Sequence, residues 1–186
     1  MKPILFNTDM VRAILDGRKT QTRRAIKPQP KGTPRYNNLR CHWYDHYLST
    51  VIPIPRQPFR FSETLWVRET WLKDDYEYQF KVLGNGQIFC DDGSTKWRPS
   101  IHMPREAARL FLRVKGVRAE RLSDISFEDI KAEGITDPEK LSFPDLWNST
   151  IKPKDIEKYG WSANPWVWVY TFEKISKEEA QHRNGN

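Results

Sequence analysis

The sequence lacks the features that mark several specialised classes of protein. It holds only two cysteines, Cys41 and Cys90, among 186 residues, too few for a disulfide framework. No apolar run in it approaches the roughly 18 residues that a membrane-spanning helix needs. The opening MKPILFNTDM has one lysine and a very short apolar stretch, too little for a signal peptide. We therefore expect a soluble, cytoplasmic protein in a reducing setting, with no membrane partner and no obligate protein partner.

Acidic residues are absent from a long stretch near the N-terminus. No acid lies between Asp16 and Asp45, and eight bases occupy this gap: Arg18, Lys19, Arg23, Arg24, Lys27, Lys31, Arg35 and Arg40. The chain has 31 bases and 24 acids, so without these eight bases the net charge of +7 would disappear. Positive charge concentrated in this way favours a polyanionic partner such as RNA.

Hydrophobic periodicity and turn residues predict an α+β domain built round a small sheet, open or closed. Helices are expected at residues 7–16, 126–134 and 142–150, and strands at 64–71, at 108–122 and in the closing NPWVWVYTFEKI. The total is about four or five strands and three short helices. Gly116 indicates a bulge, and the Asn-Gly pair at 85 and 86 indicates a hairpin. The proline-rich residues 28–60 predict a long loop or inserted hairpin.

The stretch GRKTQTRR, which follows the first expected helix, allows two interpretations. It is either an anion or nucleic-acid site in which Lys19 and Thr22 do chemistry, or a solvated basic loop. In a regular strand these two side chains would point to opposite faces, so cooperation needs an irregular backbone. A catalytic lysine also needs a lowered pKa, which neighbouring arginines and partial burial could provide. These residues alone do not decide between the two interpretations.

Other residues suggest binding roles with weaker signals. Trp71 and Trp97 flank expected loops and could stack on bases, and Arg105 could extend the basic surface together with Arg109. We assign nucleic-acid binding to Arg18, Arg23, Arg24, Arg68, Trp71, Trp97 and Arg105. Cys41, His42 and His46 are zinc-ligand types, but a structural site normally needs four ligands. We therefore expect no metal and no cofactor.

The chain contains the block LDGRKTQTRR, then an LWVRE strand, then the block FLRVKGVRAERLSDISFEDIKAEGI, and it ends on a Trp-rich strand. This order of motifs resembles the ASCH domain family. ASCH domains are PUA-like β-barrels related to RNA-binding modules, and the overall form is similar to the larger, prophage-type members. The resemblance implies a single domain over residues 1–175, with insertions at about 28–60 and 73–100 and a flexible tail at 176–186.

The resemblance also implies an activity. Small bacterial ASCH enzymes hydrolyse 4-acetylcytidine with a lysine, a threonine and a glutamate, which correspond by motif to Lys19, Thr22 and Glu133. The implied roles are proton acceptor for Lys19, nucleophile for Thr22 and proton donor for Glu133, and the implied partner is RNA or a modified nucleoside. Two alternatives remain open: a non-catalytic RNA-binding module, and a ribonuclease that acts on single-stranded RNA.

Overall fold

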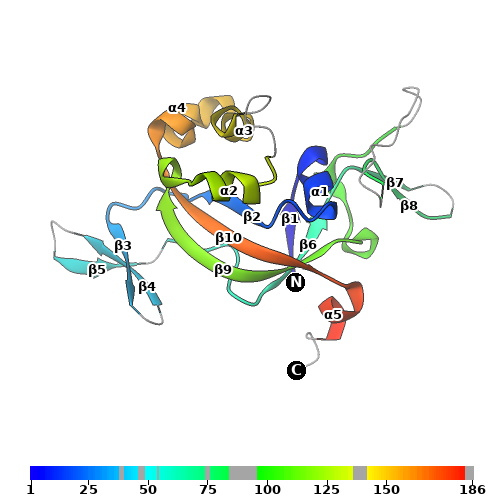
Figure 1. Cartoon of the computed structure of the whole chain (residues 1–186), viewed down its shortest axis with the longest axis horizontal. Coiled ribbons are helices and arrows are strands. Elements are labelled where there is room, and N and C mark those ends of the chain that lie inside the picture. The colour runs from blue at the N-terminus through cyan, green and yellow to red at the C-terminus, as the bar shows by residue number, and fades with distance from the viewer. Residues whose placement is uncertain are drawn as a thin grey trace. The chain divides into compact units, whose positions relative to one another are not determined.

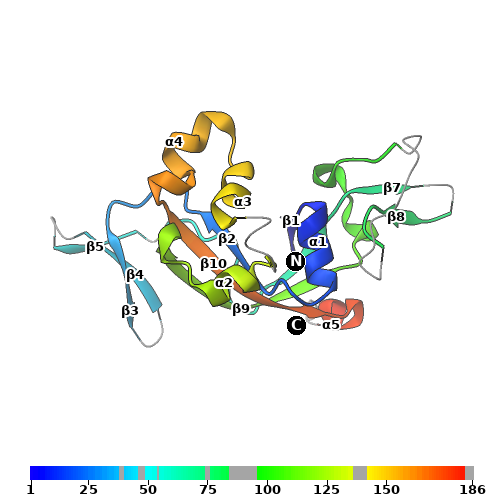
Figure 2. The same ribbon diagram turned by 45° about the horizontal axis from the view of Figure 1, so that its top comes forward.

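The computed structural model describes residues 1–37, 40–45, 49–53, 55–73, 76–83, 96–135 and 142–182. The chain divides into two compact units. Unit 1 comprises Met1–Thr20, Phe61–Lys115 and Phe172–Asn186, and unit 2 comprises Gln21–Arg60 and Gly116–Thr171. Two long strands, β9 (Phe111–Arg121) and β10 (Trp166–Ile175), contribute residues to both units (Figures 1 and 2).

Unit 1 contains the first half of the main sheet. Strand β1 (Lys2–Leu5) runs parallel to β6 (Thr64–Arg68), which pairs antiparallel with the start of β9. Helix α1 (Thr8–Leu15) begins after Asn7, whose side chain accepts a hydrogen bond from the Met10 amide and so caps the helix. A separate antiparallel pair is formed by β7 (Trp71–Lys73) and β8 (Tyr78–Phe80).

The core of unit 1 is aromatic and apolar. Its buried side chains include Trp66, Trp71, Met103, Phe111 and Ile175. Three short elements supply the remaining cover: the 3-10 turns η1 (Ser100–His102) and η2 (Arg105–Ala107) and the helix α5 (Lys177–His182).

Unit 2 contains the other half of the main sheet and most of the helices. Strand β2 (Gln21–Ala25) pairs antiparallel with β10. The helices are α2 (Phe127–Ala132), α3 (Phe143–Ser149) and α4 (Ile156–Tyr159), with 3-10 turns η3 (Leu122–Asp124), η4 (Pro153–Asp155) and η5 (Trp161–Ala163) (Figure 1). Their shared core holds Leu122, Phe143, Trp147, Val167 and Val169.

A second, three-stranded sheet also belongs to unit 2. It consists of β3 (Thr33–Asn37), β4 (Arg40–Asp45) and β5 (Thr50–Ile52), all antiparallel. Trp43 on β4 is fully buried, and its ring lies edge-on to Trp166 at 5.2 Å and to Trp168 at 6.5 Å. These contacts attach the small sheet to strand β10 through one face.

The predicted α+β class and most of the predicted elements are confirmed. The helices expected at 7–16, 126–134 and 142–150 are α1, α2 and α3, and the expected closing strand is β10. The Asn-Gly pair at 85 and 86 and His46 lie outside the described residues. Within the described residues, no helix is long and apolar enough to cross a membrane.

Several predictions need correction. The strand expected at 64–71 ends at Arg68, and Trp71 begins the separate β7. In the stretch predicted as a long loop or inserted hairpin, β3, β4 and β5 form a three-stranded sheet, which has one strand more than a hairpin. In the tail expected to be frayed, α5 forms, because Ala180 is fully buried in the unit 1 core. The main sheet has the strand order β1-β6-β9-β10-β2. In the described part of the chain its two edge strands, β1 and β2, do not pair with each other, so the sheet is open and does not form the expected closed barrel.

Gly116 lies within the continuous strand β9, where it leaves room for the neighbouring side chain of Thr171. A Cβ atom added there would lie 2.6 Å from Oγ1 of Thr171, well inside contact distance. A side chain at position 116 would therefore require the Thr171 side chain to shift.

Candidate functional site

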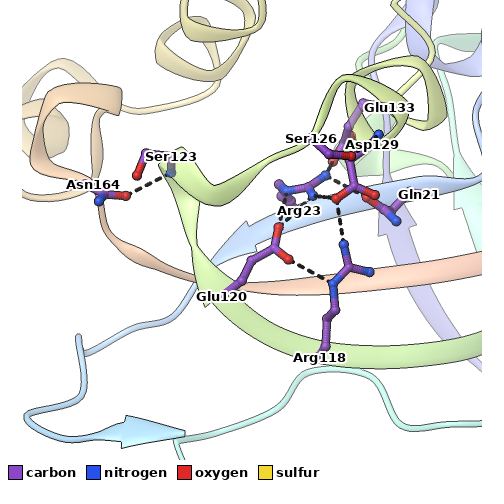
Figure 3. A network of polar contacts seen from close by, with 9 residues as sticks. All are labelled: Gln21, Arg23, Arg118, Glu120, Ser123, Ser126, Asp129, Glu133 and Asn164. Atoms are coloured by element: carbon purple, nitrogen blue, oxygen red, sulfur yellow. Dashed lines mark hydrogen bonds and ion pairs between the residues drawn. The ribbon is translucent and has the colours of Figure 1, made fainter.

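The guanidinium of Arg23 is the centre of a polar network in unit 2 (Figure 3). The Arg23 side chain is only 1% exposed, and it forms ion pairs with Glu120 at 2.6 Å, with Asp129 at 2.7 Å and with Glu133 at 3.1 Å. It also donates a hydrogen bond of 2.7 Å to Oε1 of Gln21. A buried charge is tolerated only when it is paired and hydrogen-bonded, and this one is bound by three carboxylates.

Helix α2 supplies two of the three carboxylates. Ser126 caps its first turn by accepting a hydrogen bond from the Asp129 amide, and Glu133 is the C-cap residue, followed by Gly134 with a positive φ of 95°. Asp129 and Glu133 lie four residues apart, so they share one face of the helix. That face of the helix packs against β2. Gln21 and Arg23 lie two residues apart on this strand, so their side chains point to the same side.

Strand β9 supplies the third carboxylate and a second guanidinium. Arg118 Nε donates to Oε2 of Glu120 at 2.8 Å, and its Nη2 donates to Oδ2 of Asp129 at 2.7 Å. Asp129 and Glu120 therefore each bind two guanidinium groups, Arg23 and Arg118. The network joins β2, β9 and α2 through charge-assisted hydrogen bonds.

Electrostatics favour the ionised state of two members of the network, Asp129 and Arg118. Burial tends to raise the pKa of Asp129, but the charges of Arg23 and Arg118 and hydrogen bonds from Gln21 and Arg23 outweigh it, so this pKa is lowered. Burial likewise tends to lower the pKa of Arg118, but Glu120 and Asp129 raise it overall. The pKa of Arg24 is lowered by burial, against the opposing charges of Glu133 and Tyr170.

Thr22 lies next to this network in sequence but on the other side of the strand. It is buried, 3% exposed, and stands opposite Tyr170 in the pairing of β2 with β10. Because side chains alternate along a strand, Thr22 and Arg23 leave β2 from opposite faces. Arg24 leaves β2 on the same face as Thr22, and it too interacts with the charge of Glu133, so this carboxylate is near side chains from both faces. Tyr170 is itself fully buried, with its ring centroid 5.2 Å from that of Phe59.

Lys19 belongs to unit 1 and is also buried, 2% exposed. Its Nζ lies 5.5 Å from the ring centroid of Phe6, within the range of a cation–π interaction. The backbone amides of Arg18 and Lys19 both donate to the carbonyl of Ala13 at 2.9 Å, which ties the start of the basic stretch to the last turn of α1.

The remaining residues assigned to nucleic-acid binding lie in different settings. Arg18 is paired with Asp16 at 2.7 Å, and Arg68 lies over the Trp66 ring at 4.8 Å, with its Nε buried and without a hydrogen-bond partner among the described residues. Trp71 is a core residue of unit 1, so its ring is not at the surface.

Trp97 and Arg105 are more accessible members of unit 1. Trp97 is half-buried with Lys81 6.0 Å from its ring centroid. Arg105 is exposed on η2 beside a hollow of about 400 Å³, whose lining also includes Phe111 and Lys177.

Sequence reasoning missed three partners of Arg23, namely Gln21, Glu120 and Asp129, and it missed Arg118, which binds two of the same carboxylates. The sequence did contain a signal for this network. Polar or charged residues stand two positions apart in QTR on β2 and in RAE on β9, which places each pair on one face of its strand. It also missed Glu69, which is 2% exposed and paired with Arg109 at 2.7 Å. Burial raises the pKa of Glu69, while the hydrogen bond and charge of Arg109 lower it in part. Arg109 is therefore engaged with Glu69 and does not simply extend a basic surface.

Comparisons with known proteins identify no family for the chain. No family model matches it, and no curated protein matches it. Among solved structures it is similar to the crystal structure of protein EF3133 from Enterococcus faecalis, described with the family model DUF984. The identity is 12% and the TM-score 0.47, with 95% of this chain and 82% of that chain covered. A likeness at this level bears on neither the site nor the activity.

Proposed function

We propose that this chain is an ASCH-type, PUA-like protein that binds RNA or a modified nucleoside and hydrolyses the amide of 4-acetylcytidine. Thr22 Oγ1 attacks the acetyl carbonyl as Lys19 takes the hydroxyl proton, and Glu133 protonates the departing exocyclic amine. Water then hydrolyses the acetyl-threonine ester, so the products are cytidine and acetate and the threonine is restored. A threonine hydroxyl needs such a base, because it is weakly nucleophilic by itself.

The burial of the three assigned residues carries this proposal. Lys19, Thr22 and Glu133 are 2%, 3% and 5% exposed. Taking polar groups out of water costs free energy unless each is compensated, so surface acids and bases are normally left exposed. A solvated basic loop would not bury a lysine and a threonine within four positions of each other. Their burial supports a role beyond solubility.

A second candidate function, a binding module without catalysis, is favoured by the contact between Arg23 and Glu133. The 3.1 Å ion pair gives Glu133 a structural task, because it attaches the end of α2 to β2. Under this alternative the Arg23 network only holds α2 on β2. Exposed bases elsewhere in the chain then contact the phosphates of the RNA. Product formation separates the two candidates.

The test is incubation of the protein with 4-acetylcytidine and, separately, with short single-stranded RNA, with all products identified by mass spectrometry. Thr22→Ser keeps a hydroxyl and should retain some hydrolysis, while Thr22→Val keeps the shape and should retain none. Thr20→Val is a matched control, because Thr20 is exposed and only two positions away. Absence of cytidine with wild-type protein would reject the amidohydrolase, and cleaved RNA would indicate a ribonuclease instead.

A further inference from the structure

The small sheet of unit 2 has two unlike faces. One face carries Trp43, which is fully buried against Trp166 and Trp168. Tyr44 follows Trp43 directly along β4, so its side chain lies on the other face. Tyr44 is paired with Thr33 of β3 and with Val51 of β5, and directly opposed residues share a face. We call the face that carries Thr33, Arg35, Tyr44 and Val51 the Tyr44 face.

The Tyr44 face is accessible and combines an aromatic ring with a cation. Val51 is 60% exposed and Arg35 is exposed. The guanidinium carbon of Arg35 lies 4.3 Å from the centroid of the half-buried Tyr44 ring, which is a close cation–π contact. Bases of single-stranded nucleic acids stack on aromatic rings and on guanidinium planes, and this pair offers both.

Charge in this part of the chain is strongly positive. Between Asp16 and Glu63 the only acid in the sequence is Asp45. Arg23 is neutralised inside unit 2 by three carboxylates. The cations of unit 2 that remain exposed in this stretch include Lys31, Arg35, Arg56 and Arg60. The exposed positive charge therefore belongs to the segment that builds the small sheet.

We propose that the Tyr44 face binds single-stranded RNA, with a base stacked on the Arg35–Tyr44 pair and phosphates held by Arg35 and by other exposed cations of this stretch. The inference rests on the RNA-binding part of the proposed function and adds a place and a class of RNA. Single-stranded RNA fits better than a duplex, because stacking on a protein ring needs bases that are not already stacked.

The test is fluorescence anisotropy with a labelled oligouridine of about 12 nucleotides, a length within the usual range for such sites. Affinity is measured between about 50 and 200 mM salt. Arg35→Gln should weaken binding and reduce the slope of log affinity against log salt by about 0.7, the value for one lost phosphate contact. Lys154→Gln is the matched control, since it removes one exposed cation of unit 2 far along the chain from this sheet. It should change neither affinity nor slope.

Tyr44 tests the stacking interaction separately from charge. Tyr44→Leu should weaken binding about tenfold, which corresponds to a stacking loss within the usual range, while Tyr44→Phe should keep affinity. Circular dichroism melting shows whether Tyr44→Leu is folded, and Arg35→Gln, at an exposed position, provides the second variant if it is not. Unchanged affinity in Arg35→Gln and in a folded Tyr44→Leu would overturn the inference.

Failure of this inference is distinguishable from failure of the proposed hydrolysis. Turnover of free 4-acetylcytidine by wild-type protein, without any binding of oligouridine, would overturn the Tyr44 face and leave the amidohydrolase. Binding of oligouridine that depends on Arg35 and Tyr44, without turnover, would support the Tyr44 face and leave the chain as a binding module.

Discussion

Nη1 of Arg23 on β2 lies 3.1 Å from Oε1 of Glu133 at the end of α2, 110 residues later in the chain. Both side chains are buried, and the same guanidinium also binds Glu120 and Asp129. One arginine of the basic stretch is therefore part of the interior, where it holds a helix on a strand. The stretch is not a uniform surface for polyanions, and its residues have to be tested one by one.

Glu133→Gln tests the proton-donor role. The amide oxygen of glutamine can still accept from Arg23, but the side chain cannot act as a carboxylic acid, so we expect hydrolysis of 4-acetylcytidine to fall about 100-fold or more. Thermal unfolding should show that the protein remains folded. Glu128→Gln is the control, because Glu128 is an exposed acid on the same helix. Full activity in Glu133→Gln would assign Glu133 to structure alone.

Lys19→Arg tests the proton-acceptor role. Arginine keeps the charge but does not lose its proton in proteins, so we expect hydrolysis to be abolished while the affinity for oligouridine is retained. Lys115→Arg, at an exposed position of unit 1, should leave both unchanged. Product formation and binding are measured on the same preparations. A Lys19→Arg protein that turns over normally would contradict the role.

Arg23→Met should destabilise unit 2. It leaves Glu120, Asp129 and Glu133 without their shared cation, and breaking a buried ion pair in this way typically costs about 3–5 kcal/mol of unfolding free energy. Urea unfolding measures this loss. Arg12→Met, at an exposed position on α1, should change stability by less than about 0.5 kcal/mol. Equal stabilities of the two variants would show that the network contributes nothing net.

Asp129 predicts a pH dependence of stability. Its pKa is lowered in the folded chain, so the folded state binds its proton less readily than the unfolded state does. Its contribution is fully present above the ordinary aspartate pKa of about 3.9 and is lost as pH falls through the lower folded value. Unfolding free energy measured from neutral pH into this acidic range should therefore decline less steeply in Asp129→Asn than in wild type. An identical acid decline would contradict the assignment.

Local signals in the sequence predicted much of the fold. Asn7 and Ser126 are the first residues of the helices predicted at 7–16 and 126–134, and both accept the hydrogen bonds that start α1 and α2. Gly134 is the last residue of the helix predicted at 126–134, and it has the left-handed φ that glycine tolerates. These predictions succeeded because capping and helix termination depend on residues within one turn of each other. The small sheet formed by β3, β4 and β5 was harder to predict, since strand pairing depends on partners outside any local window.

The sequence by itself determined which residues could carry charge and chemistry, and where its helices begin and end. Only the tertiary structure decided what those charges do. Arg23 and Arg35 both belong to the same acid-free stretch, yet Arg23 is buried among carboxylates from β9 and α2, while Arg35 is exposed beside Tyr44. The physical reason is that a charge is compensated by whichever partners the fold brings within a few ångströms. For Arg23 those partners lie 97 to 110 residues away in the chain.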